Sequence, residues 1–219
     1  MKDLSLNYEI SMPRTGVVNN AIILLHGYGG DGKDISILSS IWERHLKNTL
    51  IICPDGHEVC KINPGGYQWF DLTLDDPEYI LEQVLIAEKK INFFINEIKN
   101  KFKLENKDIC LSGFSQGCML SLNVGLTSKD NFNSIIGFSG KIIDKENLSK
   151  RIQNTTKVLL FHGSLDTIVP SNNLLESKDF LLRHKIQVDT KMIIDCEHTI
   201  PSEASSSALL YLKKNFQKK

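Results

Sequence analysis

A chain of 219 residues is long enough for one domain with a substantial core and short for two, so we expect a single domain over residues 1–219. Lysine and arginine together number 26, as do aspartate and glutamate, and this balance excludes a strongly basic surface for nucleic acid. No apolar run is long enough to cross a bilayer, no secretory signal opens the chain, and the five irregularly spaced cysteines predict reduced thiols, so we expect a cytoplasmic protein.

Short apolar runs alternate with helical periods along the chain, which is typical of βαβ units around a mostly parallel sheet. Residues 4–10 are predicted to add an antiparallel edge strand. The predicted parallel strands are residues 21–25, 49–53, 108–112, 134–138, 157–161 and 187–194. The predicted helices are residues 34–46, 80–102, 116–127, 171–184 and 201–216. Reactive groups gather at the carboxyl ends of such strands, so we expect the chemistry in the loops that follow them.

A G-x-S-x-G motif, Gly113-Phe114-Ser115-Gln116-Gly117, lies between a predicted strand and a predicted helix. This is the context that a nucleophile elbow requires, because the serine must project from a tight turn. A side chain at either glycine would collide with neighbouring backbone. The motif therefore indicates Ser115 as a nucleophile. The alternative is a glycine-rich turn in which Ser115 only caps the helix.

A serine hydroxyl needs a base, and the base needs an orienting acid, which follow the serine in the chain order Ser, Asp, His. We expect His198 to be the base, because it lies between the last strand and a helix that opens near Pro201. Asp166, in the loop after the fifth parallel strand, is the expected acid. We expect a structural role for His162. His184 is expected to face solvent from a helix.

Two further acids, Asp195 and Glu197, lie close to His198 in the sequence. They are too near to reach the far side of its ring while the ring faces the serine, so Asp166 is preferred over both.

Acyl transfer places negative charge on the carbonyl oxygen, and fixed N–H donors stabilise it. One expected donor is the backbone N–H of Gln116, at the start of a helix. The second is expected in the glycine-rich loop 26–32, where the N–H of Tyr28 is our choice. The alternative reading of this loop is a plain flexible turn.

Taken together, five parts of the sequence resemble the phospholipase/carboxylesterase family, which includes acyl-protein thioesterases and small bacterial carboxylesterases. These parts are residues 24–31, 68–71, 113–117 and 162–170, and His198. The resemblance implies an α/β-hydrolase fold with helices on both faces of the sheet and no large lid domain. It also implies the triad Ser115, Asp166 and His198 and the oxyanion donors Tyr28 and Gln116.

The same resemblance implies that Trp69 and Phe70 lie near the acyl pocket. It implies hydrolysis of short to medium acyl esters, with lysophospholipids or S-acylated proteins among the candidate substrates. We expect no cofactor, at most transient contact with a membrane, and a homodimer is compatible with exposed apolar loop residues. Two positions depart from the family pattern: Glu197 stands where glycine is common, and Lys141 where an apolar pocket residue is expected. Both bear on substrate preference.

Three other readings stay open. A dienelactone-hydrolase-like enzyme would share the fold but use a cysteine nucleophile, which Ser115 argues against. A non-catalytic binding domain on the same scaffold is the second. The third is a metal site at Cys53, His57 and Cys60, whose spacing lacks paired ligands.

Overall fold

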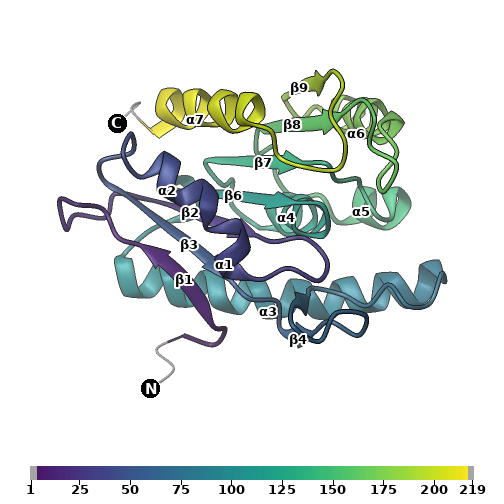
Figure 1. The fold of residues 1–219 in the computed structure, drawn as a ribbon, viewed down its shortest axis with the longest axis horizontal. Coiled ribbons are helices and arrows are strands. Elements are labelled where there is room, and N and C mark those ends of the chain that lie inside the picture. Colours follow the sequence, from purple (N-terminus) through teal and green to yellow (C-terminus); the bar gives the residue numbers. More distant parts are fainter. Residues whose placement is uncertain (1–3, 217–219) are drawn as a thin grey trace.

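A computed structural model describes residues 4–216, so the predicted domain limits at residues 1 and 219 lie outside the described part. Seven strands form one sheet in the order β1-β3-β2-β6-β7-β8-β9 (Figure 1). The edge strand β1 runs antiparallel to β3, and every other pair in this sheet is parallel. The strands are β1 (Tyr8–Ser11), β2 (Asn20–Leu25), β3 (Thr49–Pro54), β6 (Ile109–Phe114), β7 (Ser134–Phe138), β8 (Val158–Gly163) and β9 (Val188–Ile193).

Helices cover both faces of the sheet, because the central strands are apolar on both sides. Ile22 and Leu24 of β2 pack on one face, while Ile23 and Leu25 pack on the other. The first face is covered by α1 (Gly32–Ile35), α2 (Ile37–Trp42) and α7 (Ser202–Phe216). The second is covered by α3 (Pro77–Phe102), α4 (Gln116–Thr127), α5 (Lys145–Arg151) and α6 (Asn172–Arg183). This layered arrangement confirms the predicted fold class.

Two predicted elements differ in extent. The edge strand begins at Tyr8, and the leucines that precede it are buried in the core without joining the sheet. The helix predicted over residues 34–46 is two short helices that end at Trp42. Serine hydroxyls interrupt it: those of Ser36, Ser39 and Ser40 each donate to the carbonyl oxygen three residues earlier. Such bonds compete with helix geometry.

Three small elements were not predicted. They are the helix α5, the 3₁₀ helix η1 (Asn106–Asp108) and a hairpin of β4 (Glu58–Val59) and β5 (Tyr67–Gln68). Within residues 4–216, none of the helices combines the length and apolar character that spanning a bilayer requires.

Candidate active site

Ser115 occupies a strained turn between β6 and α4, with φ of 51° and ψ of −114°. The two motif glycines make the turn sterically feasible. A Cβ on Gly113 would lie 2.3 Å from the carbonyl carbon of Gly117, and a Cβ on Gly117 would lie 2.3 Å from the carbonyl oxygen of Leu25. The N–H of Ser115 donates to Phe138 O at 2.8 Å, which ties the turn to β7. The two glycines thus allow the serine to adopt an unfavourable backbone conformation.

Ser115, His198 and Asp166 meet at the carboxyl end of the sheet, as predicted from their places after β6, β9 and β8. The Oγ atom of Ser115 lies 3.0 Å from His198 Nε2, and His198 Nδ1 lies 2.7 Å from Asp166 Oδ2. An ionised carboxylate only accepts hydrogen bonds, so Nδ1 carries the ring proton and Nε2 is free to accept one from the serine hydroxyl. The Phe114 ring packs against His198, with ring centroids 4.8 Å apart.

The Asp166 carboxylate is surrounded by N–H groups. Its Oδ1 accepts from the backbone N–H groups of Ile168 at 3.0 Å and Val169 at 2.9 Å. Burial alone would raise the pKa of Asp166, but the hydrogen bonds from His198 and Val169 outweigh it, so the pKa lies below the usual value. The carboxylate is therefore ionised at neutral pH, which the tautomer of His198 requires.

His162 is also a neighbour of Asp166, a contact that the sequence did not predict. Its Nε2 atom lies 2.8 Å from Val169 O and 3.2 Å from Asp166 Oδ2. Both partners are acceptors, so Nε2 carries a proton that it shares between them. The ring is buried at the end of β8, and the histidine that contacts the serine hydroxyl is His198. His162 is thus placed to hold the acid and its loop.

The other candidates for these roles lie elsewhere. The His184 ring packs on Phe180 at the end of α6, and its Nδ1 atom contacts Phe180 O at 2.8 Å. Asp195 and Glu197 are exposed, and the acid that contacts the His198 ring is Asp166. A Cβ on Gly163 would lie 2.5 Å from Glu197 O, so this glycine lets the loop carrying His198 approach β8.

The loop after β2 is fixed by His26. The N–H of Gly56 donates to His26 Nε2 at 2.8 Å, which leaves the proton on Nδ1, and Nδ1 lies 2.6 Å from Gly27 O. In a trans peptide the C=O and N–H groups point in opposite directions. The Gly27 carbonyl points to the His26 ring, so the N–H of Tyr28 points away from it. Burial lowers the pKa of His26, which favours the neutral ring that this arrangement needs.

This loop lies directly against the elbow. A Cβ on Gly27 would be 3.0 Å from the Phe114 ring and 3.4 Å from Ser115 Cβ. The backbone of the loop therefore reaches the nucleophile, as its glycine-rich sequence predicts. Behind it lies the fully buried Trp69, whose Nε1–H donates to His26 O at 3.0 Å and whose ring centroid is 5.1 Å from that of His26.

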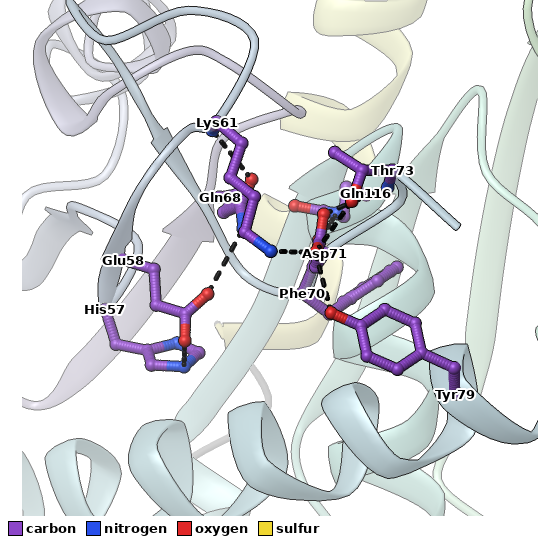
Figure 2. Close-up of polar contacts among 9 residues, drawn as sticks. All are labelled: His57, Glu58, Lys61, Gln68, Phe70, Asp71, Thr73, Tyr79 and Gln116. Atoms are coloured by element: carbon purple, nitrogen blue, oxygen red, sulfur yellow. Dashed lines mark hydrogen bonds and ion pairs between the residues drawn. The ribbon is translucent and has the colours of Figure 1, made fainter.

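Gln116 links the elbow to residues 69–70 through its side chain. Its Oε1 accepts from the N–H of Trp69 at 2.7 Å. Its Nε2 donates to Phe70 O, also at 2.7 Å (Figure 2). Phe70 lines the cleft beside Ser115, whereas Trp69 does not. Of the two residues predicted at the acyl pocket, the structure therefore places one in the cleft and the other behind it.

A buried carboxylate anchors the end of this segment. Asp71 contacts Lys61 Nζ and accepts from Tyr79 OH at 2.7 Å and from the N–H of Thr73 at 2.9 Å (Figure 2). Burial would raise the pKa of Asp71, but these hydrogen bonds lower it to well below the usual value. The cluster connects residues 69–73 to the first turns of α3, which form part of the cleft wall.

The cleft beside Ser115 has a volume of about 760 Å³, within the range of small-molecule sites. Its apolar lining includes Phe70, Leu72, Ile80, Met119, Ile142, Ile143, Ile168 and Val169. Charged side chains also line it, namely Asp75, Lys141, Asp144, Lys145 and Glu176. Among the described residues, no group of three or more His, Cys, Asp or Glu side chains is arranged to hold a metal ion.

Comparison with known proteins agrees with this geometry. The model of the phospholipase/carboxylesterase family matches residues 7–216. The chain is 28% identical over 210 residues to "Acyl-protein thioesterase 1" of Kluyveromyces lactis, with 89% of this chain and 91% of that protein covered. It is 25% identical over 225 residues to the Yarrowia lipolytica protein of the same name, with 95% and 97% covered.

Solved structures extend the likeness to three dimensions. Esterase PE8 is 31% identical and superimposes with a TM-score of 0.92, covering 95% of this chain and 98% of that one. Acyl-protein thioesterase 2 of Zea mays is 22% identical with a TM-score of 0.75, covering 96% and 99%, and supports the fold alone.

Proposed function

From the premise that this chain belongs to the phospholipase/carboxylesterase family, and is a hydrolase acting on ester bonds, we propose that Ser115, His198 and Asp166 are its catalytic triad. The observation that carries the proposal is the chain of contacts from Ser115 Oγ to His198 at 3.0 Å and from His198 to Asp166 at 2.7 Å. A nucleophile, a base and an orienting acid in this order are what acyl transfer by serine requires.

In the proposed acylation, Ser115 Oγ attacks the carbonyl carbon of the ester while His198 Nε2 takes the hydroxyl proton. The Oγ–carbon bond forms, and the electron pair of the C=O bond moves to the oxygen. The proton on Nε2 then passes to the leaving alcohol or thiol as its bond to the carbon breaks. Asp166 stabilises the positively charged ring during this step and keeps its own proton count unchanged. A water molecule repeats the sequence to release the acid.

The transient oxyanion needs donors that are in place before the reaction. We assign them to the N–H groups of Gln116 and Tyr28. The first lies at the start of α4, where the helix dipole favours negative charge. The second belongs to the peptide whose direction the His26 ring fixes. Donors of this kind contribute about 3–4 kcal/mol each to the transition state.

The cleft that Ser115 opens into is the proposed acyl site, with Phe70 and Met119 among its apolar walls. Its size suits short to medium acyl chains. Because relatives are named acyl-protein thioesterases, we take thioesters and S-acylated proteins as the first candidate substrates and lysophospholipids as further ones.

The proposed acylation and deacylation use side chains of the protein and water alone. We also propose that residues 1–219 are one catalytic domain. A homodimer and transient membrane contact stay predictions.

The test is a pair of serine variants with a matched control. Ser115→Ala should abolish labelling by a fluorophosphonate probe and cleavage of p-nitrophenyl butanoate. Ser112→Ala, three residues earlier on β6, removes a buried hydroxyl that has no hydrogen-bond partner among the described residues, so it should leave both unchanged. Retained esterase activity in folded Ser115→Ala would refute the assignment and favour another nucleophile.

A further inference from the structure

A second pocket lies beside the proposed triad, and its lining includes His198 but not Ser115. It has a volume of about 390 Å³ and lies between the loop after β2, the α1–α2 segment and the loop that carries His198. We call it the His198 pocket. Its lining is His26, Gly27, Tyr28, Gly30, Asp34, Ile35, Ile37, Leu38, Phe114, His198, Thr199 and Ile200.

The residues of the reaction divide between the two cavities. Ser115 and Gln116 line the 760 Å³ cleft, His198 lines the His198 pocket, and Tyr28 borders both. A tetrahedral carbon on Ser115 Oγ therefore has its oxyanion directed to the donors at Tyr28 and Gln116. Its two remaining substituents, the acyl chain and the leaving group, must extend into the two cavities.

Proton delivery decides which substituent goes where. When the carbon–oxygen bond to the leaving group breaks, its electron pair stays on the leaving oxygen, and that oxygen takes the proton that His198 Nε2 received from Ser115. The leaving oxygen must then lie within hydrogen-bond reach of Nε2, roughly 3 Å. The group attached to it extends past the ring into the His198 pocket, and the acyl chain takes the cleft.

The lining of the His198 pocket has a clear chemical character. Ile35 and Leu38 are buried apolar residues of its wall, and Ile37 lines it with 68% of its surface exposed. Apart from the two histidines, Asp34 is the acidic or basic side chain in this lining among the described residues, and the phenol of Tyr28 is neutral at pH 7. The neighbouring Lys33 is exposed and is not part of the lining.

The Asp34 carboxylate is available to a ligand. Within the described residues it forms no ion pair and accepts no hydrogen bond, while Asp31 caps the N–H of Asp34 at 2.7 Å and holds the helix start in place. A Cβ built on Gly30 would be 3.7 Å from Asp34 Oδ2, so the carboxylate lies against the loop that carries Tyr28. An anion entering this pocket would meet a negative charge, and a cation an unpaired counter-charge.

We propose that the His198 pocket is the leaving-group subsite, and that Asp34 makes it select apolar alcohols or thiols with a positive charge over those with a negative charge. The proposal rests on the proposed function. It adds a site for the leaving group, which is the part of the substrate that the acyl cleft does not bind.

Three butanoyl esters of equal reach test it: those of choline, of 3,3-dimethylbutan-1-ol and of 2-hydroxyethanesulfonate, which carry a cation, no charge and an anion. We expect kcat/KM to fall in that order, with about a tenfold difference between cation and anion from a charge several ångströms away. Asp34→Asn should reduce the cation-to-anion ratio about fivefold and change the neutral ester less than twofold. Acid release at constant pH measures all three.

Two further variants sharpen the test. Asp75→Asn removes a carboxylate from the acyl cleft and should leave the ratio unchanged. Ile37→Lys changes an exposed residue, so it should fold, and it should move preference toward the sulfonate ester. If all three esters are cleaved but neither Asp34→Asn nor Ile37→Lys changes the cation-to-anion ratio of kcat/KM, the subsite is overturned and the proposed function stands. Failure to cleave any of the three while p-nitrophenyl butanoate is still cleaved would overturn the subsite alone, and failure to cleave p-nitrophenyl butanoate as well would overturn the proposed function.

Discussion

Replacing His26 by alanine tests how the site holds the proposed second oxyanion donor, the N–H of Tyr28. The change removes the Nδ1–H that contacts Gly27 O at 2.6 Å and the acceptor for the N–H of Gly56 at 2.8 Å. Gly27 O keeps the N–H of Gly30 at 3.1 Å, so the Tyr28 peptide is loosened rather than lost. Removing an oxyanion donor outright costs about 10²–10³ in kcat, so we expect a smaller loss of about 10- to 100-fold with little change in KM.

The same change should also lower stability. The buried N–H of Gly56 is left unpaired, at a cost of about 1–3 kcal/mol, and the missing ring leaves a cavity beside Trp69. We expect the free energy of unfolding to fall by about 3–5 kcal/mol in total. Denaturant unfolding and steady-state kinetics on the same preparation separate the two effects.

Ile98→Ala is the control, because it removes a buried side chain of α3 at a similar cost of about 3 kcal/mol but touches neither loop nor elbow. It should lose stability and keep kcat. If both variants lost kcat equally, the loss would follow from stability, and if His26→Ala kept its kcat, the ring would not orient the donor.

The pH dependence of stability carries a further signature of His26. Burial lowers its pKa below the ordinary value of 6.5 in the folded protein, against smaller opposite effects of the Gly27 hydrogen bond and Asp55. As the pH falls through 6.5, the unfolded chain takes up this proton first, so the free energy of unfolding should decrease. Above 6.5 the contribution is fully present. His26→Ala should show a shallower decrease than the wild type between pH 6.5 and 5.

Two other substitutions test the supports of the acid and of the cleft wall. His162→Leu removes a donor from Asp166 and should lower kcat about tenfold at unchanged KM, whereas His184→Leu at the end of α6 should leave kcat unaffected; equal kinetics for the two would contradict the contact. Asp71→Asn should lower the free energy of unfolding by about 2 kcal/mol at pH 7. Because the folded pKa of Asp71 lies below 3.8, the wild type loses stability as the pH falls below that value, and the variant should lose less. Urea titrations at pH 7 and pH 3.5 in which wild type and variant lose the same free energy of unfolding would contradict this.

The sequence predicted the parts of the fold that have a strong period. Apart from β9, which alternates polar and apolar residues, the parallel strands are apolar runs that end at glycine-bearing turns, and all of them lie within a few residues of their predicted limits. Missing from the prediction is α5, where Leu148 is the buried residue of a seven-residue helix, too little for a pattern. The hairpin of β4 and β5 has two residues per strand and no period at all.

For the site, the sequence predicted where the three proposed triad residues lie but not the side chains that hold them and the neighbouring loop in place. Ser115, Asp166 and His198 each follow a strand, so the topology of a parallel sheet brings them to one edge. The contacts of His26 and His162 depend on which ring nitrogen carries the proton. The partner that decides this is Gly56 for His26, 30 residues away, and Val169 for His162, seven residues away. One signal was available: both histidines precede a glycine at the end of a strand, which is also where the chain reaches the site.

Gln116 connects the proposed acyl cleft with the proposed oxyanion donors. Its position in the elbow places its backbone N–H beside Ser115. Its side chain accepts from the N–H of Trp69 and donates to Phe70 O, both at 2.7 Å. Trp69 in turn bonds His26 O, and His26 directs the Tyr28 peptide. The first donor, the cleft wall and the second donor are therefore linked in sequence by buried hydrogen bonds that fix one another's geometry. A displacement at Gln116 or Trp69 would therefore change both the fit of the acyl chain and the stabilisation of the oxyanion, since these two residues contact both parts of the site.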